Sequence, residues 1–178
     1  MRRSSAAAGA SLFFALAPGV VAGVVPWLIT GWDAQPAWLV VRIAGGVLTA
    51  VCTLVLVDAF MRFVMEGAGT PAPVAPTERL VVGGLFRYVR NPMYLAVVGA
   101  ILGQALLLGR PVLAVYGAVV GLIMAAFVRW YEEPALSDQF GAEYDAYRAA
   151  VRPWWPRRRP WRPVQPPPNR IVPPGHRH

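Results

Sequence analysis

The sequence contains no lysine, one cysteine and two histidines, and charged residues make up only 15% of its 178 positions. A single cysteine excludes an intrachain disulfide, and Cys52 lies in an apolar run, where a packed thiol is expected. His176 and His178 both stand in the last three residues. The sequence therefore offers no metal-ligand pattern and no Ser-His-Asp constellation, and we expect no metal.

Hydrophobic residues, in contrast, make up 56% of the chain. Soluble domains are usually less apolar and carry more charge, so this composition favours an integral membrane protein. The net charge of +8 comes from arginine alone. Because the arginines lie between and beyond the apolar runs, anionic membrane lipids are better partners for them than nucleic acid, which we do not expect to bind.

Four apolar stretches approach the ~20 residues that a transmembrane helix needs. We expect helices over residues 6–30, 37–65, 92–109 and 111–131, with kinks at Pro18 and Pro26. If the N-terminus is cytoplasmic, only Arg42 and Arg110 fall near the opposite face, in agreement with the positive-inside rule. The predicted fold is an all-α integral membrane protein with about four spans and both termini in the cytoplasm.

An amphipathic helix is predicted after the fourth span. Its apolar residues recur at steps of three and four, which is typical of a helix that lies on the membrane or caps a bundle: Leu136, Phe140, Tyr144, Tyr147 and Val151. The tryptophans and arginines that follow suit the headgroup region. We divide the chain into two N-terminal spans (1–66), a core (67–156) and a disordered Arg/Pro-rich tail (157–178).

Pairs of glycines four residues apart occur in three of the predicted spans. They are Gly19 with Gly23, Gly99 with Gly103, and Gly117 with Gly121. Small residues at this spacing let helix backbones approach closely in lipid. Packing within a compact bundle is the favoured interpretation, and a homodimer contact through one of these Gly-x-x-x-Gly faces is the alternative.

The segment from Gly84 to Tyr94 is polar, aromatic and basic, and it runs directly into the third span. Asn91 suits a helix N-cap and Pro92 the first helical position. The unpaired N–H groups of that helix, its dipole and the nearby arginines would attract an anion at the membrane surface. From these residues alone, a basic juxtamembrane loop remains the alternative.

Carboxylates near the predicted spans need an explanation. Asp58, Arg62 and Glu66 are four apart, so they either form an ion ladder along one helix or face a site. Glu132 and Glu133 follow the fourth span, where negative charge opposes the helix dipole. They either open the next helix before Pro134 or act as acceptors in a site.

Two motifs together resemble the isoprenylcysteine carboxyl methyltransferase family, especially its small bacterial members, which are related to phospholipid N-methyltransferases. Residues 84–94 follow G-x-[YF]-x-x-x-R-[HN]-P-x-Y, and residues 132–147 follow E-E-x-x-L-x-x-x-F-G-x-E-Y-x-x-Y. The resemblance covers about residues 76–156. It implies methyl transfer from S-adenosylmethionine, bound on the cytoplasmic side of a bacterial inner membrane, to a lipophilic carboxylate, thiol or amine entering from the bilayer.

Carried over by position, the resemblance implies a set of cofactor contacts: Arg79, Leu80, Val81, Phe86, Arg90, Asn91, Pro92, Met93, Tyr94, Glu132 and Glu133. Arg129 and Arg90 are the catalytic candidates, because either could orient an anionic acceptor. Phe86 and Asn91 stand where the family commonly has Tyr and His. Val128 stands where the isoprenylcysteine enzymes have a substrate-contacting Arg, so the acceptor is left open.

Two other functions compete with this one. A membrane NADPH-dependent reductase of the steroid reductase type carries a similar aromatic-Pro-x-Tyr stretch, but Gly-Glu commonly follows it. Here Leu95 and Ala96 follow Tyr94. A non-enzymatic membrane scaffold is the third interpretation, and it leaves the paired polar motifs unexplained.

Overall fold

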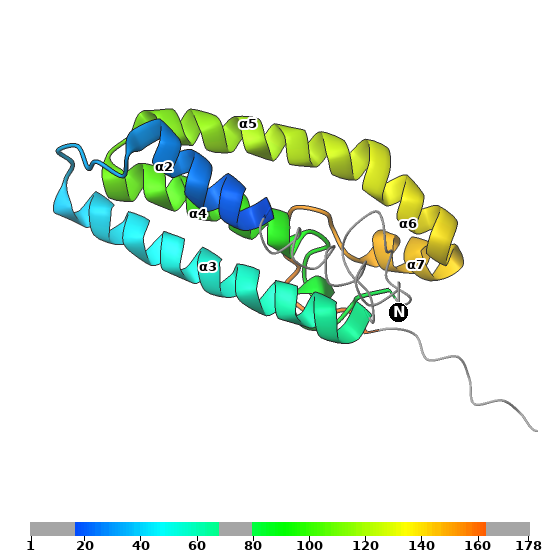
Figure 1. Cartoon of the computed structure of the whole chain (residues 1–178). Helices are drawn as coiled ribbons and strands as arrows, with labels where there is room; N and C mark the ends of the chain where they lie inside the picture. Colours follow the sequence, from blue (N-terminus) through cyan, green and yellow to red (C-terminus); the bar gives the residue numbers. More distant parts are fainter. Residues whose placement is uncertain (1–16, 68–79, 163–178) are drawn as a thin grey trace, which may run out of the picture.

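The computed structural model describes residues 17–67 and 80–162, and within these residues the chain is helical, without a β-strand (Figure 1). The first described helix contains a π turn, η1 (Val20–Val24), followed by α2 (Val25–Thr30). After it come the helices of the core: α3 (Leu39–Gly67), the 3-10 turn η2 (Gly84–Arg87), α4 (Pro92–Leu108), α5 (Pro111–Phe127), the π turn η3 (Val128–Glu132), α6 (Glu133–Phe140) and α7 (Ala142–Ala150). The predicted all-α class is confirmed for this part of the chain.

Two of the described helices are long and apolar enough to cross a membrane, by length and composition: Leu39–Arg62 and Pro111–Phe140. The helices Ala17–Thr30 and Pro92–Leu108 are apolar but shorter. Helices thus lie where four spans are predicted, while four crossings and the orientation of the termini stay predictions. The start of the first predicted helix lies outside the described residues.

Helix α4 lies at the centre of the bundle, beside α3, α5 and the η1–α2 helix (Figure 1). Its Val97, Ile101 and Ala105 are buried against α5. Helix α3 instead keeps large apolar side chains outward, such as Leu54, whose exposed fraction is 71%. An extended apolar surface of this kind suits lipid rather than water. The central α4 therefore presents its first turn at one end of the bundle on a support packed from several sides.

Close backbone approach between α3 and α4 depends on glycine. A β-carbon on Gly103 would lie 2.7 Å from the Thr49 nitrogen, and one on Gly45 would lie 2.7 Å from the Gly103 oxygen. Likewise, a β-carbon on Gly117 would lie 3.2 Å from the Ile101 side chain. These glycines pack within the bundle, as the favoured interpretation predicts.

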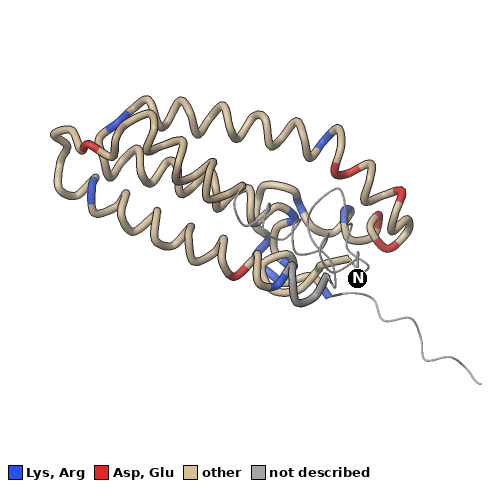
Figure 2. The backbone as a smooth tube through the Cα atoms, in the orientation of Figure 1, with Lys and Arg blue, Asp and Glu red and all other residues tan. Residues whose placement is uncertain are grey.

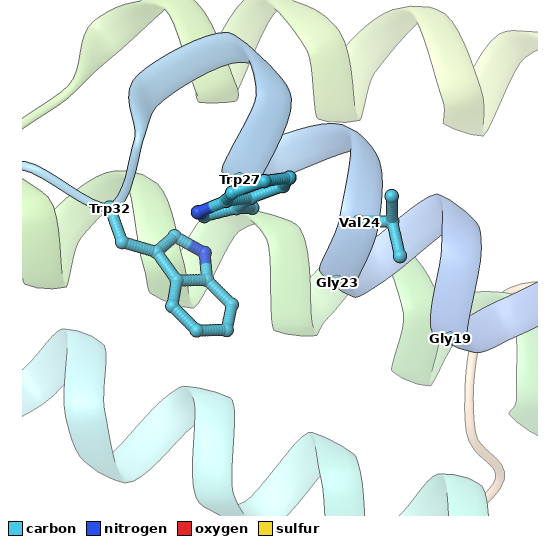
Figure 3. A pocket seen from close by; sticks show the side chains of 5 residues that line it. All are labelled: Gly19, Gly23, Val24, Trp27 and Trp32. Atoms are coloured by element: carbon cyan, nitrogen blue, oxygen red, sulfur yellow. The ribbon is translucent and has the colours of Figure 1, made fainter.

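The remaining glycine pair faces an open groove. Nothing lies within 4 Å of a β-carbon built on Gly19 or Gly23. Together with Val24, Trp27 and Trp32 these glycines line a groove of about 300 Å³ (Figure 3). The homodimer through a Gly-x-x-x-Gly face stays a prediction, and this pair is the one of the three not used in packing among the described residues.

The π turn η1 immediately precedes Pro26, while the kinks expected at Pro18 and Pro26 stay predictions. Proline has no N–H, so the Ala22 carbonyl four residues earlier loses its helical donor. Buried Gln104 of α4 replaces that donor, with its Nε2 2.6 Å from the Ala22 oxygen. The Tyr116 hydroxyl of α5 donates similarly to the Val21 oxygen at 2.9 Å. Two polar side chains of neighbouring helices thus stabilise the π turn.

Replacing Gln104 with leucine is expected to lower the free energy of unfolding by about 1–3 kcal/mol, because the Ala22 carbonyl is then left without a donor at a buried position. Tyr116→Phe removes the second donor and should lower it by about 0.5–1.5 kcal/mol. Unfolding of the detergent-purified chain, followed by circular dichroism, measures both. Equal stability of Gln104→Leu and the unchanged chain would contradict this account.

Candidate cofactor site

The residues predicted to form a site gather at the end of the bundle where α3 finishes and α4 begins (Figure 1). Three parts of the chain meet there: the η2 turn with the first turn of α4, the η3–α6–α7 region, and residues 152–162, here called the strap. Arg79 lies outside the described residues.

Asn91 occupies the N-cap position of α4 and Pro92 its first turn, as predicted, but the Asn91 side chain does not cap the helix. Its Nδ2 instead donates to the Pro153 oxygen at 3.2 Å. The predicted position of the cap is thus confirmed, but the capping hydrogen bond is not made, because the Asn91 side chain bonds to a backbone carbonyl of the strap instead. Asn91 ties the start of α4 to the strap.

Tyr94 and Glu132 come together although they are 38 positions apart. The Tyr94 hydroxyl donates to Oε2 of Glu132 at 2.9 Å. Glu132 ends the η3 turn, and a π turn shifts the phase of the helix that continues past it. The shift brings one carboxylate oxygen to the first turn of α4 and leaves the other without a protein donor among the described residues.

Glu133 points to different partners. Its Oε1 lies 2.9 Å from Nη1 of Arg90, with exposed fractions of 8% and 9% for the two side chains. The same Arg90 nitrogen donates to the Tyr144 hydroxyl at 3.2 Å, and Nη2 of Arg148 lies 3.6 Å from the second Glu133 oxygen. Adjacent helical residues do not share a face, so the two glutamates separate. Glu133 holds Arg90 in place, while Glu132 remains beside Tyr94.

One donor of Arg90 is unused. Its Nε is buried and has no hydrogen-bond partner among the described residues. A buried cationic donor without a partner is costly, and a carboxylate or phosphate oxygen of a ligand would relieve that cost. The two groups together thus fit a ligand that has one anionic group for Arg90 and hydroxyls for Glu132.

The apolar candidates divide between two clusters. Val81 and Phe86 are buried with Ala59 of α3, and Met93 packs against them. Leu80 packs instead on the other cluster, formed by Tyr144, Tyr147 and Val151. Neighbouring side chains of an extended segment point to opposite sides, which explains the division. Phe86, Val81 and Met93 therefore share one wall, and Leu80 belongs to another.

The pair Asp58–Arg62 lies beside the η2 turn. Nε of Arg62 is 3.1 Å from Oδ2 of Asp58, and both side chains are partly exposed. Gly84 starts the turn with φ +50°, and a β-carbon there would lie 2.7 Å from Cζ of Arg62. Glycine adopts this positive φ without strain and leaves room for the Arg62 side chain. Asp58 and Arg62 form an ion pair along one helix, and Arg62 also packs on the η2 turn. The Glu66 side chain lies outside the described part of the chain, so the predicted ladder stays a prediction.

The amphipathic segment consists of two helices, not the single one that the spacing predicts. Gly141 has φ +51° and separates α6 from α7. The apolar side chains nevertheless converge, because Leu136 and Phe140 of α6 pack against the Tyr144–Tyr147–Val151 cluster. Burial raises the pKa of the Tyr147 phenol, which therefore stays protonated and donates to the Phe86 oxygen at 2.6 Å. The segment thus caps the bundle and stabilises η2.

The strap runs antiparallel to residues 87–91. The Arg90 nitrogen donates to the Arg152 oxygen at 3.0 Å, and the Arg157 nitrogen donates to the Tyr88 oxygen at 2.9 Å. Trp161 and Arg87 exchange two bonds, Trp161 N to Arg87 O at 2.9 Å and Arg87 Nε to Trp161 O at 2.7 Å. Arg157 and Trp161 of the predicted tail thus take part in these contacts, and the disorder expected for the tail stays a prediction. Prolines 153, 156 and 160 favour extended backbone and were the available signal.

The family model for phospholipid methyltransferases matches residues 40–143, which is more than half of the chain. The chain belongs to the phospholipid methyltransferase family. The match extends from the start of α3 into α7 and includes the η2 turn, Tyr94 and both glutamates. No curated protein and no solved structure matches the chain.

Membership of the phospholipid methyltransferase family confirms the resemblance to isoprenylcysteine-type membrane methyltransferases and implies a methyltransferase associated with membranes. The reductase and scaffold interpretations are not favoured by it. In this member of the phospholipid methyltransferase family, the Arg129 side chain is exposed on η3, next to the buried Val128. Its predicted role toward an acceptor stays a prediction.

Proposed function

We propose that this protein transfers a methyl group from S-adenosylmethionine to a lipophilic acceptor at the cytoplasmic surface of a bacterial inner membrane. The observation that supports this most is the Tyr94–Glu132 hydrogen bond beside the buried, unpaired Nε of Arg90, in a chain of this family. A carboxylate that can accept from hydroxyls, a guanidinium N–H that can donate to an anion and an apolar wall lie at the same end of the bundle.

S-adenosylmethionine supplies a methyl group bonded to a sulfonium sulfur, which is open to attack without a protein nucleophile. Glu132 accepts from the ribose hydroxyls and Arg90 Nε donates to the carboxylate. Phe86, Val81 and Met93 form the wall for the adenine. Residues 91 and 92 fix the first turn of α4, while Leu80 borders the site, and the contact expected of Arg79 stays a prediction. The chain's own tasks are alignment and exclusion of water.

Glu133 acts through Arg90 in this proposal. Both of its oxygens already face arginines, so it positions the Arg90 guanidinium instead of contacting the cofactor. Arg90 in turn binds the cofactor carboxylate, and a direct role in the methyl transfer is left to Arg129. This division follows from the partners that each side chain has.

The acceptor enters from the bilayer. The family description makes the amine of a phospholipid headgroup the first acceptor to test, followed by an isoprenylcysteine carboxylate and a thiol. Arg129 is exposed and available to orient an anionic acceptor. Unchanged turnover in Arg129→Ala would contradict that role. Labelled methyl transfer from S-adenosylmethionine onto lipid extracts and simple thiols identifies the acceptor class.

Calorimetric titration of S-adenosylhomocysteine into the detergent-purified chain tests the proposal. We expect micromolar binding that Glu132→Ala abolishes, because the ribose then loses its acceptor. Glu143→Ala is the matched control, since it removes an exposed carboxylate of α7 and should leave binding unchanged. Binding of NADPH in place of S-adenosylhomocysteine would overturn the proposal in favour of a reductase.

A further inference from the structure

The strap of residues 152–162 is the most basic part of the described chain. It holds five arginines and no acidic residue. Four of these arginines are exposed: Arg152, Arg158, Arg159 and Arg162. Trp155 is also outward, with an exposed fraction of 73%. Neither the candidate site nor the fold uses these outward side chains.

The strap is a preformed surface. Backbone groups at Arg152, Arg157 and Trp161 are hydrogen-bonded to residues 87–91, so the backbone that carries the exposed side chains is already ordered. A ligand that meets these side chains has little backbone entropy left to overcome. The arginines therefore form a prearranged basic face.

The place of the strap in the fold selects its partner. Its backbone bonds reach Arg90, and its Pro153 oxygen accepts from Asn91, immediately before α4 enters the apolar bundle. The strap thus lies at the level where apolar helices give way to polar chain, which for a membrane protein is the headgroup region. Arginine and tryptophan both suit that region. The arginine guanidinium binds phosphate, and the tryptophan side chain has an apolar ring body and a polar N–H.

Negative charge near this face is limited among the described residues. The exposed acids Asp138, Glu143 and Asp145 lie on α6 and α7, and Asp145 already accepts from Ser137. Exposed Asp58, on α3, is already paired with Arg62. Figure 2 shows acidic positions along the α6–α7 region and a cluster of basic positions, with one acidic position beside it, at the end of the bundle where α3 finishes. The strap arginines are therefore not neutralised by the described chain.

We propose that the outer face of the strap binds anionic phospholipid headgroups of the bilayer, with Arg158 and Arg159 toward phosphate and Trp155 at the interface. Basic side chains close to an anionic membrane are attracted to its negative surface potential. This interaction is separate from methyl transfer and does not rest on it.

Lipid-dependent stabilisation of the full detergent-purified chain tests this proposal. A ligand that binds the folded state raises its thermal midpoint, so phosphatidylglycerol should raise it more than phosphatidylcholine does. The difference should shrink as salt concentration rises. Arg158→Gln with Arg159→Gln should remove most of the difference, whereas Arg158→Lys with Arg159→Lys should retain it.

Arg42→Gln is the matched control, because Arg42 is exposed near the start of α3, outside the strap. An equal loss in this control, or equal stabilisation by both lipids, overturns the proposal. Inorganic phosphate and a short RNA are added as competing ligands. If either matches the effect of phosphatidylglycerol on the unchanged chain, the face binds free anions or nucleic acid and the lipid proposal fails.

Discussion

Replacing Glu133 with alanine is expected to lower the free energy of unfolding by about 3–5 kcal/mol, because it leaves the Arg90 guanidinium buried without its counter-charge. The exposed fraction of the Arg90 side chain is only 9%, and its Nε already lacks a partner among the described residues. Without Glu133, the Tyr144 hydroxyl is the one side-chain acceptor left for the guanidinium in the part of the chain that the structure describes. Unfolding in mild detergent, followed by circular dichroism, measures this loss.

Two controls separate the buried charge from the loss of a side chain. Glu143→Ala removes an exposed carboxylate of α7 and should change stability by no more than about 0.5 kcal/mol. The double variant Arg90→Met with Glu133→Leu removes both charges and should recover much of the stability, since paired burial offers little net gain over apolar packing. If Glu133→Ala were no less stable than Glu143→Ala, the ion pair would not support the site.

The helices of the bundle were largely predictable because their signals are local. Long apolar runs located α3, α4 and α5, and a proline marks the start of both α4 and α5. The π turns were not predictable in this way. A π turn depends on where the freed carbonyls find new donors, and for Ala22 that donor is Gln104, which lies on another helix.

The candidate site was predictable in its residues but not in its pairing. The motifs include both Tyr94 and the Glu132–Glu133 pair, yet they do not say that Glu132 meets Tyr94 while Glu133 meets Arg90. That choice depends on the phase of the helix through η3. The strap was missed for a similar reason, because its bonds join residues far apart in the chain and their acceptors are backbone carbonyls, including those that accept from the Arg87 and Asn91 side chains.

Removing the hydroxyl of Tyr147 tests whether α7 positions the η2 turn. The Tyr147 side chain is buried, and its hydroxyl lies 2.6 Å from the Phe86 oxygen. Tyr147→Phe keeps the ring but removes this donor, so the free energy of unfolding should fall by about 1–3 kcal/mol. On the proposed function, affinity for S-adenosylhomocysteine should fall on the order of tenfold, which corresponds to about 1.4 kcal/mol.

The two readouts together distinguish positioning from general stability. Tyr131→Phe serves as the matched control, because Tyr131 is 51% exposed and its loss of a hydroxyl should alter neither quantity. A folded Tyr147→Phe variant that is less stable but binds S-adenosylhomocysteine with unchanged affinity would show that the turn keeps its geometry without α7. Weaker binding with an unchanged fold requires that the hydroxyl holds Phe86 against the cofactor. In that case α7 acts on the site through a single hydrogen bond, 61 residues away in the chain.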